Sequence, residues 1–183
     1  MQERIFKTPP EEILTDRLKL VRPTVSQAAD ILKAYAGDPK ATKYLSWPTK
    51  NSVEEAEDFV KRTLISWDAG NSFTWLVLER DSSSIVGCLA FRPARTGYEI
   101  GYVIGPAYWG KGLGTELVKR MIAVGFEDPA VERVWAYCDT ENEASIKLLE
   151  KCGMAKEGCL KKWGESPNLG KGPRDQFVYA VVR

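Results

Sequence analysis

Residues 98–115 read YEIGYVIGPAYWGKGLGT, and this stretch says most about how the chain folds. Its first part, residues 98–104, alternates two kinds of side chain in the way typical of a β-strand with two different faces. Glycines follow at positions 110, 112 and 114, and residues 113–126 then carry apolar side chains at helical spacing. The pattern predicts a strand, a glycine-rich turn and a helix in direct succession.

The glycine-rich turn predicts a site for an anionic group. Glycine lets the main chain approach a ligand closely, and the N–H groups in the first turn of a helix have no acceptor within the helix. They also lie at the positive end of the helix dipole, so phosphate is the most natural ligand. The alternative is a tight strand-to-helix turn without a ligand, since glycine-rich turns are common.

Outward from this stretch, the remaining patterns predict one mixed α+β domain that covers residues 1–183. Strands are expected at residues 17–21, 73–78, 85–91, 98–104, 131–137 and 176–182. Helices are expected at residues 26–35 with Ser26 as the N-cap, from Asn51 or Ser52 to Gly70, at 113–126 and at 142–152. Helix 113–126 is a crossover between two strands of the sheet. Long loops are expected at residues 37–50 and 161–175.

The composition narrows the class of protein. The chain has 183 residues, 26 Lys and Arg against 25 Asp and Glu, and no histidine. The absence of histidine excludes Ser-His-Asp and Cys-His nucleophile pairs and His-ligated zinc, and no metal site is expected. A net charge of +1 argues against a dedicated nucleic-acid binder. No apolar run approaches the length of a membrane span and no signal peptide is evident, so a cytoplasmic location is expected.

Three phosphate-binding patterns compete for the turn. The dinucleotide fingerprint G-x-G-x-x-G fails because Thr115 and Leu117 stand where its third glycine belongs. The Walker pattern G-x-x-x-x-G-K-S/T nearly matches from Gly105, but Gly112 stands where the Mg²⁺-binding hydroxyl belongs. A P-loop nucleotide hydrolase therefore stays open as an alternative.

The third pattern is that of the GNAT acetyltransferases. Residues 109–114, WGKGLG, resemble the family's acetyl-CoA signature Q/R-x-x-G-x-G/A, with Trp109 in place of Gln or Arg. Residues 142–154, NEASIKLLEKCGM, resemble a second family segment, N-x-x-S/A-x-x-L-x-x-K-x-G-F/M. The stretch YWGKGLGTE is similar to the branch that includes the ribosomal-protein N-terminal acetyltransferases. The likeness covers nearly the whole chain.

The resemblance implies a three-layer fold, in which helices cover both faces of a twisted, mostly antiparallel sheet of six to seven strands. It also implies acetyl-CoA as cosubstrate. The pyrophosphate is expected on the N–H groups of the turn, and the pantetheine arm is expected along the main chain of residues 103–105. The cofactor-binding residues implied in this way are Val103, Ile104, Gly105, Trp109, Gly110, Lys111, Gly112, Leu113, Gly114, Thr115 and Asn142.

Acetyl transfer to a primary amine needs a base, because the amine is mostly protonated at neutral pH. The thioester already offers a good leaving group, so no covalent nucleophile is required. Glu99 is the predicted base, since alternation places it beside Gly101 on one strand face, and a carboxylate next to a glycine suits the wall of a cleft. A solvent-facing strand carboxylate without a catalytic role is the alternative.

The acid that protonates the departing thiolate is open at the level of sequence. Many GNAT enzymes carry a tyrosine for this purpose, and Leu149 stands at that position here. Ser145, in the second family segment, is the candidate catalytic hydroxyl, with solvent as the alternative donor.

The predicted function is an acetyl-CoA-dependent N-acetyltransferase that modifies a primary amine. The branch favours a protein N-terminal α-amine, and a small-molecule amine is the alternative acceptor. A GNAT-like module that binds CoA without catalysis is a further alternative. Acceptor selectivity is expected from the two long loops, with Tyr44, Trp47, Trp163 and Glu165 as the candidate side chains. No nucleic-acid or membrane partner is expected, and the composition fits a monomer or a homodimer.

Overall fold

An eight-stranded sheet runs through residues 6–183, the part of the chain that the computed structural model describes. Its strand order is β1-β2-β3-β4-β5-β6-β8-β7, and every neighbouring pair is antiparallel except β5 and β6. The strands are β1 (Glu12–Leu14), β2 (Leu18–Val21), β3 (Phe73–Glu79), β4 (Ile85–Ala94), β5 (Gly97–Ile104), β6 (Arg133–Asp139), β7 (Ala155–Glu165) and β8 (Pro173–Val182). The predicted mixed α+β class with a mostly antiparallel sheet is confirmed.

The strand count differs from the predicted six to seven, because β1 and β7 carry no strand pattern in the sequence. β1 has only three residues. β7 is an edge strand that is exposed along nearly its whole length, so it has no apolar alternation to reveal it. The loop predicted at residues 161–175 is therefore wrong: its two ends belong to β7 and β8, which pair on either side of a short turn at Pro167–Leu169.

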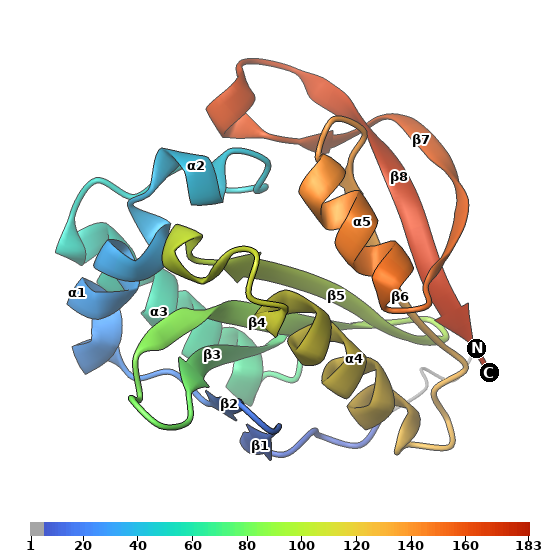
Figure 1. The fold of residues 1–183 in the computed structure, drawn as a ribbon, viewed down its shortest axis with the longest axis horizontal. Coiled ribbons are helices and arrows are strands. Elements are labelled where there is room, and N and C mark those ends of the chain that lie inside the picture. The colour runs from blue at the N-terminus through green and yellow to red at the C-terminus, as the bar shows by residue number, and fades with distance from the viewer. Residues whose placement is uncertain (1–5) are drawn as a thin grey trace.

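Helices form the outer two layers. They are α1 (Ala28–Ile31), α2 (Pro39–Thr42), α3 (Val53–Asp68), α4 (Leu113–Phe126) and α5 (Glu143–Lys151), with a π-helical turn, η2 (Leu32–Ala36), directly after α1. Figure 1 shows α4 and α5 in front of the sheet and α3 behind it. The larger core lies between the sheet and the front helices, where Leu117, Met121 and Leu149 are fully buried. A smaller core joins Ile31 and Val60 to the opposite face.

Two predicted helix starts have different outcomes. Ser52 is the N-cap of α3 and accepts the Glu55 N–H at 3.3 Å, as predicted. Ser26 is not the cap, because the first helical turn before α1, Val25–Gln27, begins with an N-cap two residues earlier. Thr24 is the N-cap there, and its own N–H donates to the side chain of Gln27, which closes a capping box. The loop predicted at residues 37–50 contains the short helix α2.

The single parallel pair, β5 and β6, separates soon after it forms. The two strands pair only over residues 97–99 and 133–135, and helix α4 is the crossover between them, as predicted. Beyond residue 99, β5 continues to Ile104 beside β4, while β6 continues beside β8. The sheet therefore opens into two parts. Within residues 6–183, no helix has the length and apolar character that a bilayer span requires.

Candidate active site

The free edge of β5 lines a slot where β5 and β6 separate. The Gly105 N–H donates to the Val86 carbonyl of β4 at 2.8 Å. Hydrogen-bonded and non-bonded positions alternate along an antiparallel ladder. Tyr102 and Ile104 therefore direct their main-chain N–H and carbonyl groups away from β4 and into the slot.

This geometry corrects the main-chain contacts predicted for residues 103–105. The Val103 carbonyl points at β4, where a Cβ added to Gly87 would lie 2.0 Å from the oxygen, so only the Val103 side chain reaches the neighbouring cleft. The Gly105 N–H is already used within the sheet. Ile104 alone of the three faces the slot, and its carbonyl accepts the indole N–H of Trp109 at 2.7 Å.

Glycine is required at the three positions of the turn for two different physical reasons, backbone conformation and helix packing. Gly110 and Gly112 have φ values of 74° and 77°, the left-handed region that side chains disfavour. Gly114 lies inside α4, where a Cβ would come within 2.6 Å of Leu148 Cδ1 on α5. The first two glycines therefore shape the turn, and the third lets α4 and α5 pack closely.

The main-chain N–H groups of the turn point to no protein acceptor. Within residues 6–183, no loop or turn hydrogen bond is donated by the N–H groups of residues 110–115. Gly110, Lys111 and Gly112 are exposed, and Gly112 is the N-cap of α4. The predicted anion-binding geometry is thus present: a helix N-terminus with free donors that face solvent.

Arg17, the residue just before β2, connects this turn to the first turn of α4. The Arg17 guanidinium donates to the Lys111 carbonyl at 3.0 Å and pairs with Glu116 of α4 at 2.6 Å. Partial burial raises the pKa of Glu116. The hydrogen bonds from Thr15 and Arg17, together with the charge of Arg17, outweigh that effect and hold the pKa below its ordinary value. The carboxylate therefore stays charged and keeps the turn in place.

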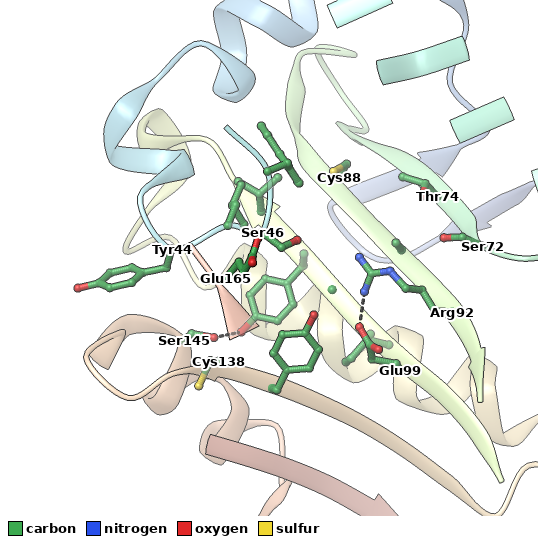
Figure 2. A pocket seen from close by; sticks show the side chains of 18 of the residues that line it. Tyr44, Ser46, Ser72, Thr74, Cys88, Arg92, Glu99, Cys138, Ser145 and Glu165 are labelled. Atoms are coloured by element: carbon green, nitrogen blue, oxygen red, sulfur yellow. Dashed lines mark hydrogen bonds and ion pairs between the residues drawn. The ribbon is translucent and has the colours of Figure 1, made fainter. Parts of the chain in front are cut away.

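A cleft of about 420 Å³ adjoins the slot. Its walls come from α3, from β3 to β6 and from the segment after α2 (Figure 2). Glu99 lies in this cleft and is paired with Arg92 of β4. Gly101 makes the pair possible, because a Cβ there would lie 3.0 Å from the guanidinium. The glycine opening predicted beside Glu99 is thus filled by an arginine.

Two hydroxyl groups meet where the slot opens into the cleft. The Tyr102 and Ser145 oxygens lie 2.7 Å apart, as Figure 2 shows for Ser145 and its bonded neighbour. Burial raises the pKa of Tyr102 well above its ordinary value, so the phenol stays protonated. Asn142 is the N-cap of α5 and accepts the Ser145 N–H at 3.2 Å, which positions the serine. Leu149 is fully buried.

No cysteine in the cleft is a thiolate. Cys88 and Cys138 both line it, and burial raises the pKa of each to about 11. A thiol with that pKa is a poor nucleophile at neutral pH. Within the described residues, no cluster of three or more His, Cys, Asp or Glu side chains is arranged to hold a metal ion.

Comparison with known proteins places the chain in a family. Residues 17–155 match the family model described as an acetyltransferase (GNAT) domain. The chain belongs to the GNAT acetyltransferases. It is 28% identical over 172 residues to the N-acetyltransferase YoaA of Bacillus subtilis (strain 168), covering 92% of this chain and 95% of that protein.

Solved GNAT structures share the fold. The microcin C7 self-immunity acetyltransferase MccE, in complex with acetyl-CoA and AMP, has a TM-score of 0.84 at 22% identity and covers 96% of this chain and 98% of its own. RimL, the ribosomal L7/L12 alpha-N-protein acetyltransferase in complex with coenzyme A, has a TM-score of 0.82 at 20% identity, covering 94% and 98%. The family model, together with relatives named N-acetyltransferases, identifies this GNAT protein as an N-acetyltransferase.

The two segments expected to select the acceptor come together over the cleft of this GNAT protein. Asn168, in the turn after β7, donates to the carbonyls of Thr42 and Trp47 at 2.7 and 3.0 Å, and it accepts the Thr49 N–H at 2.9 Å. Tyr44, Trp47 and Glu165 line the cleft. Trp163, by contrast, is 59% exposed and does not line it.

Sequence reasoning missed Tyr102 and Arg92. Alternation places Tyr102 on the apolar face of β5, and no local signal links it to Ser145, 43 positions away. Arg92 lies at the end of β4, where the sequence pattern of that strand has already faded. The register of β4 against β5, which pairs Arg92 with Glu99, is the only signal for that ion pair.

Proposed function

We propose that this protein transfers an acetyl group from acetyl-CoA directly to a primary amine. The observation that carries the proposal is the free set of N–H groups at residues 110–115, next to a slot that opens into a cleft with an ion-paired carboxylate. The MccE structure, which contains acetyl-CoA, shares the fold and supports the choice of cosubstrate.

The turn and the edge of β5 would hold the cosubstrate. The N–H groups of residues 110–115 suit the pyrophosphate, with Lys111 and Arg17 as nearby positive charges. The main chain of Tyr102 and Ile104 offers hydrogen bonds to the pantetheine arm along the slot. Asn142 uses its oxygen as a helix cap, so its side-chain NH₂ group is the part left for a ligand.

Glu99 would act as the general base. The substrate ammonium loses one proton to the Glu99 carboxylate, and the neutral amine then attacks the thioester carbonyl. The side chain is only 16% exposed and is held by Arg92, so its position is defined before the acceptor arrives. The C–N bond forms, the C–S bond breaks, and the nitrogen gives a second proton to solvent to leave the neutral amide, so no enzyme nucleophile takes part.

Ser145 would protonate the departing sulfur, and Tyr102, hydrogen-bonded to Ser145, would supply the replacement proton. The Ser145 hydroxyl gives its proton to the thiolate and takes one from the Tyr102 phenol, which solvent restores. Burial raises the pKa of Tyr102 and keeps the phenol protonated, so it gives up its proton only in the same step in which Ser145 loses its own to the sulfur. This pair takes the place of the tyrosine that is absent at Leu149.

Two acceptor classes have separate support. The likeness to RimL, named as an alpha-N-protein acetyltransferase, favours a protein N-terminus. The size of the cleft, about 420 Å³, favours a small amine. We take the small amine as the leading acceptor because it rests on this chain's own geometry.

The test combines binding and turnover. Acetyl-CoA at about 100 times its Kd is expected to stabilise the protein by about 2.7 kcal/mol in thermal unfolding, and ATP with Mg²⁺ is expected to give no such shift. Panels of small amines and free-N-terminal peptides are then incubated with acetyl-CoA, and free thiol and product mass are measured. Binding without thiol release from any acceptor indicates a non-catalytic CoA module, and stabilisation by ATP alone contradicts the proposal.

A further inference from the structure

Four polar side chains gather at the end of the cleft away from the slot. Arg62 and Ser66 lie four residues apart on one face of α3, and Ser72 and Thr74 lie at the start of β3. All four line the cleft. Figure 2 shows Ser72 and Thr74 on the opposite side of the cleft from Ser145. These residues have no part in the proposed transfer chemistry.

None of the four side chains has a partner in the part of the chain that the structure describes. Arg62 forms no ion pair there, and the hydroxyls of Ser66, Ser72 and Thr74 take part in no hydrogen bond. A guanidinium carries five N–H donors in a planar fork that matches carboxylate and phosphate oxygens. Together with three hydroxyl groups, the exposed Arg62 forms a set of groups without protein partners in the lining of one end of the cleft.

Two carboxylates that line the cleft are neutralised by ion pairs, and the remaining charges lie at different places in its lining. Glu99 is neutralised by its arginine partner, and Asp139 is paired with Arg174. Glu165 forms no ion pair within residues 6–183, and Figure 2 places it across the cleft from Ser72 and Thr74. The excess positive charge therefore lies at Arg62 and the excess negative charge at Glu165.

Strand register sets the distance between this end and the proposed base. Thr74 faces Ala90 across the β3–β4 ladder, and Arg92 of β4 faces Glu99 of β5. The hydroxyls on β3 are thus two strands away from Glu99. Thr74 is in the row of Ala90 and Gly101, two residues along β5 from Glu99. At about 4.8 Å per strand and about 3.4 Å per residue, the two backbone positions are about 12 Å apart, before the side chains reach toward one another. An amine and an anionic group joined by a few single bonds span that distance.

We infer that Arg62, Ser66, Ser72 and Thr74 bind the anionic group of the acceptor, so the acceptor is a small primary amine that carries a carboxylate or a phosphate. The inference rests on the proposed function and adds the substrate class. The guanidinium pairs with two oxygens of the anion, the hydroxyls bond to the remaining acceptor sites, and the ammonium is left at the Glu99 end.

Matched pairs of acceptors test this inference. We would measure kcat/KM for 4-aminobutyrate against butylamine, and for O-phosphoethanolamine against ethanolamine, by thiol release from acetyl-CoA. At least one anionic member is expected to exceed its neutral partner tenfold or more. Arg62→Gln is expected to raise the KM of that anionic acceptor about tenfold, with kcat and the kinetics of the neutral partner little changed. Which pair shows the effect tells a carboxylate from a phosphate.

Lys61→Gln is the matched control, since Lys61 is the neighbouring cation on α3, is paired with Glu57 and does not line the cleft. It is expected to leave both preferences intact. Equal use of neutral and anionic amines, or faster acetylation of an uncharged peptide amide than of either anionic amine, overturns the inference and leaves the acetyltransferase intact. If acetyl-CoA does not stabilise the unsubstituted protein in thermal unfolding, the proposed function itself is overturned.

Discussion

Glu99, Arg92 and Gly101 form one arrangement on two neighbouring strands. The carboxylate is positioned by the guanidinium, and the missing side chain at Gly101 is what leaves room for it. A base that is fixed in advance loses little entropy when the acceptor binds. A second Arg–Glu ion pair, between Arg133 of β6 and Glu157 of β7, lies outside the cleft with β8 between its two strands, and it allows a comparison.

Glu99→Gln is expected to lower kcat about 10²- to 10⁴-fold at neutral pH, because the acceptor ammonium then has no base. Binding of acetyl-CoA, measured by calorimetry, should not change. The deficit should shrink as pH approaches the pKa of the acceptor amine, about 10.4 for a lysine-like amine, where free amine is already present. Glu157→Gln, on exposed β7, should leave the rate unchanged. An unaltered pH–rate profile in Glu99→Gln removes Glu99 from the role.

Ser145→Ala and Tyr102→Phe test the proposed acid pair. Each is expected to lower kcat about tenfold near pH 7, since a thiolate of pKa about 8.5 is already a fair leaving group. The double variant should be no worse than either single one, because the two hydroxyls act as a unit. Above about pH 9 the losses should fade. Tyr179→Phe, whose hydroxyl bonds to Glu150 outside the cleft, is the control. If the loss of kcat in the double variant equals the two single losses combined, proton transfer from Tyr102 through Ser145 is contradicted.

At the scale of elements, the turn between β5 and α4 depends on left-handed glycines and on the tight packing of two helices. Gly110 and Gly112 hold conformations that only glycine adopts without strain, and Gly114 lets α4 approach α5. This combination leaves the first-turn N–H groups of α4 without protein acceptors while one face of the helix is buried. The anion site is therefore a property of the junction and not of either element alone.

Gly112→Ala should strain the N-cap of α4, where φ is 77°, at a cost of about 1–2 kcal/mol, and weaken acetyl-CoA binding tenfold or more. Gly153→Ala is matched in strain, with φ of 82° and open space around it at the end of α5. It should lose similar stability but keep its affinity. Thermal unfolding and calorimetric titration with acetyl-CoA measure the two effects separately. Equal loss of affinity in both variants would falsify the local role of the turn.

Asp128, just after α4, joins the start of the described chain to the end of that helix. Its carboxylate accepts the Lys7 N–H at 2.8 Å and the Ala130 N–H at 2.9 Å, and these bonds hold its pKa below the ordinary value. The folded pKa lies below the unfolded one, so this stabilisation is complete above about pH 4 and is lost as pH falls through the folded value.

Asp128→Asn is expected to reduce the free energy of unfolding by about 1–2 kcal/mol at pH 7, because the amide offers one acceptor in place of two charged ones. Denaturant titrations at several pH values should show the deficit shrinking below about pH 4, where the native carboxylate also becomes neutral. Asp58→Asn, on the exposed face of α3, should be close to neutral throughout. A deficit independent of pH contradicts the assignment.

At the scale of the whole molecule, the sheet consists of two parts joined by a short parallel ladder. β5 and β6 share only three residue pairs, so the two parts need a further connection. Asn168 supplies it on the open side, with bonds from the turn after β7 to the segment that follows α2. The segment that Asn168 holds includes Tyr44 and Trp47 of the cleft lining, so we expect the bridge to affect both stability and acceptor binding.

Asn168→Ala should cost about 1–3 kcal/mol, since it leaves two carbonyls and one N–H without their partner. The KM for the acceptor should rise severalfold, and the KM for acetyl-CoA should stay the same, because the turn at residues 110–115 is untouched. Steady-state kinetics with each substrate varied in turn measure the split. The exposed Asn71→Ala is the control. A rise confined to the KM for acetyl-CoA contradicts a role of the Asn168 hydrogen bonds in acceptor binding.

Local patterns predicted the strand, turn and helix of residues 98–126, a cap of α3 at Asn51 or Ser52 and the helix that starts at Asn142, because alternation, helical spacing and capping depend on neighbours within a few positions. The position of the glycine-rich turn, which we propose binds the pyrophosphate, follows from the same local rules. Polar β7 was missed because an exposed edge strand gains little from apolar alternation. Contacts of Tyr102 with Ser145, and of Asn168 with the segment near Thr42, join residues 43 and 126 positions apart. These contacts depend on strand order and register, which any local pattern leaves open, so only the folded sheet brings the acid pair, the cleft and its cover together.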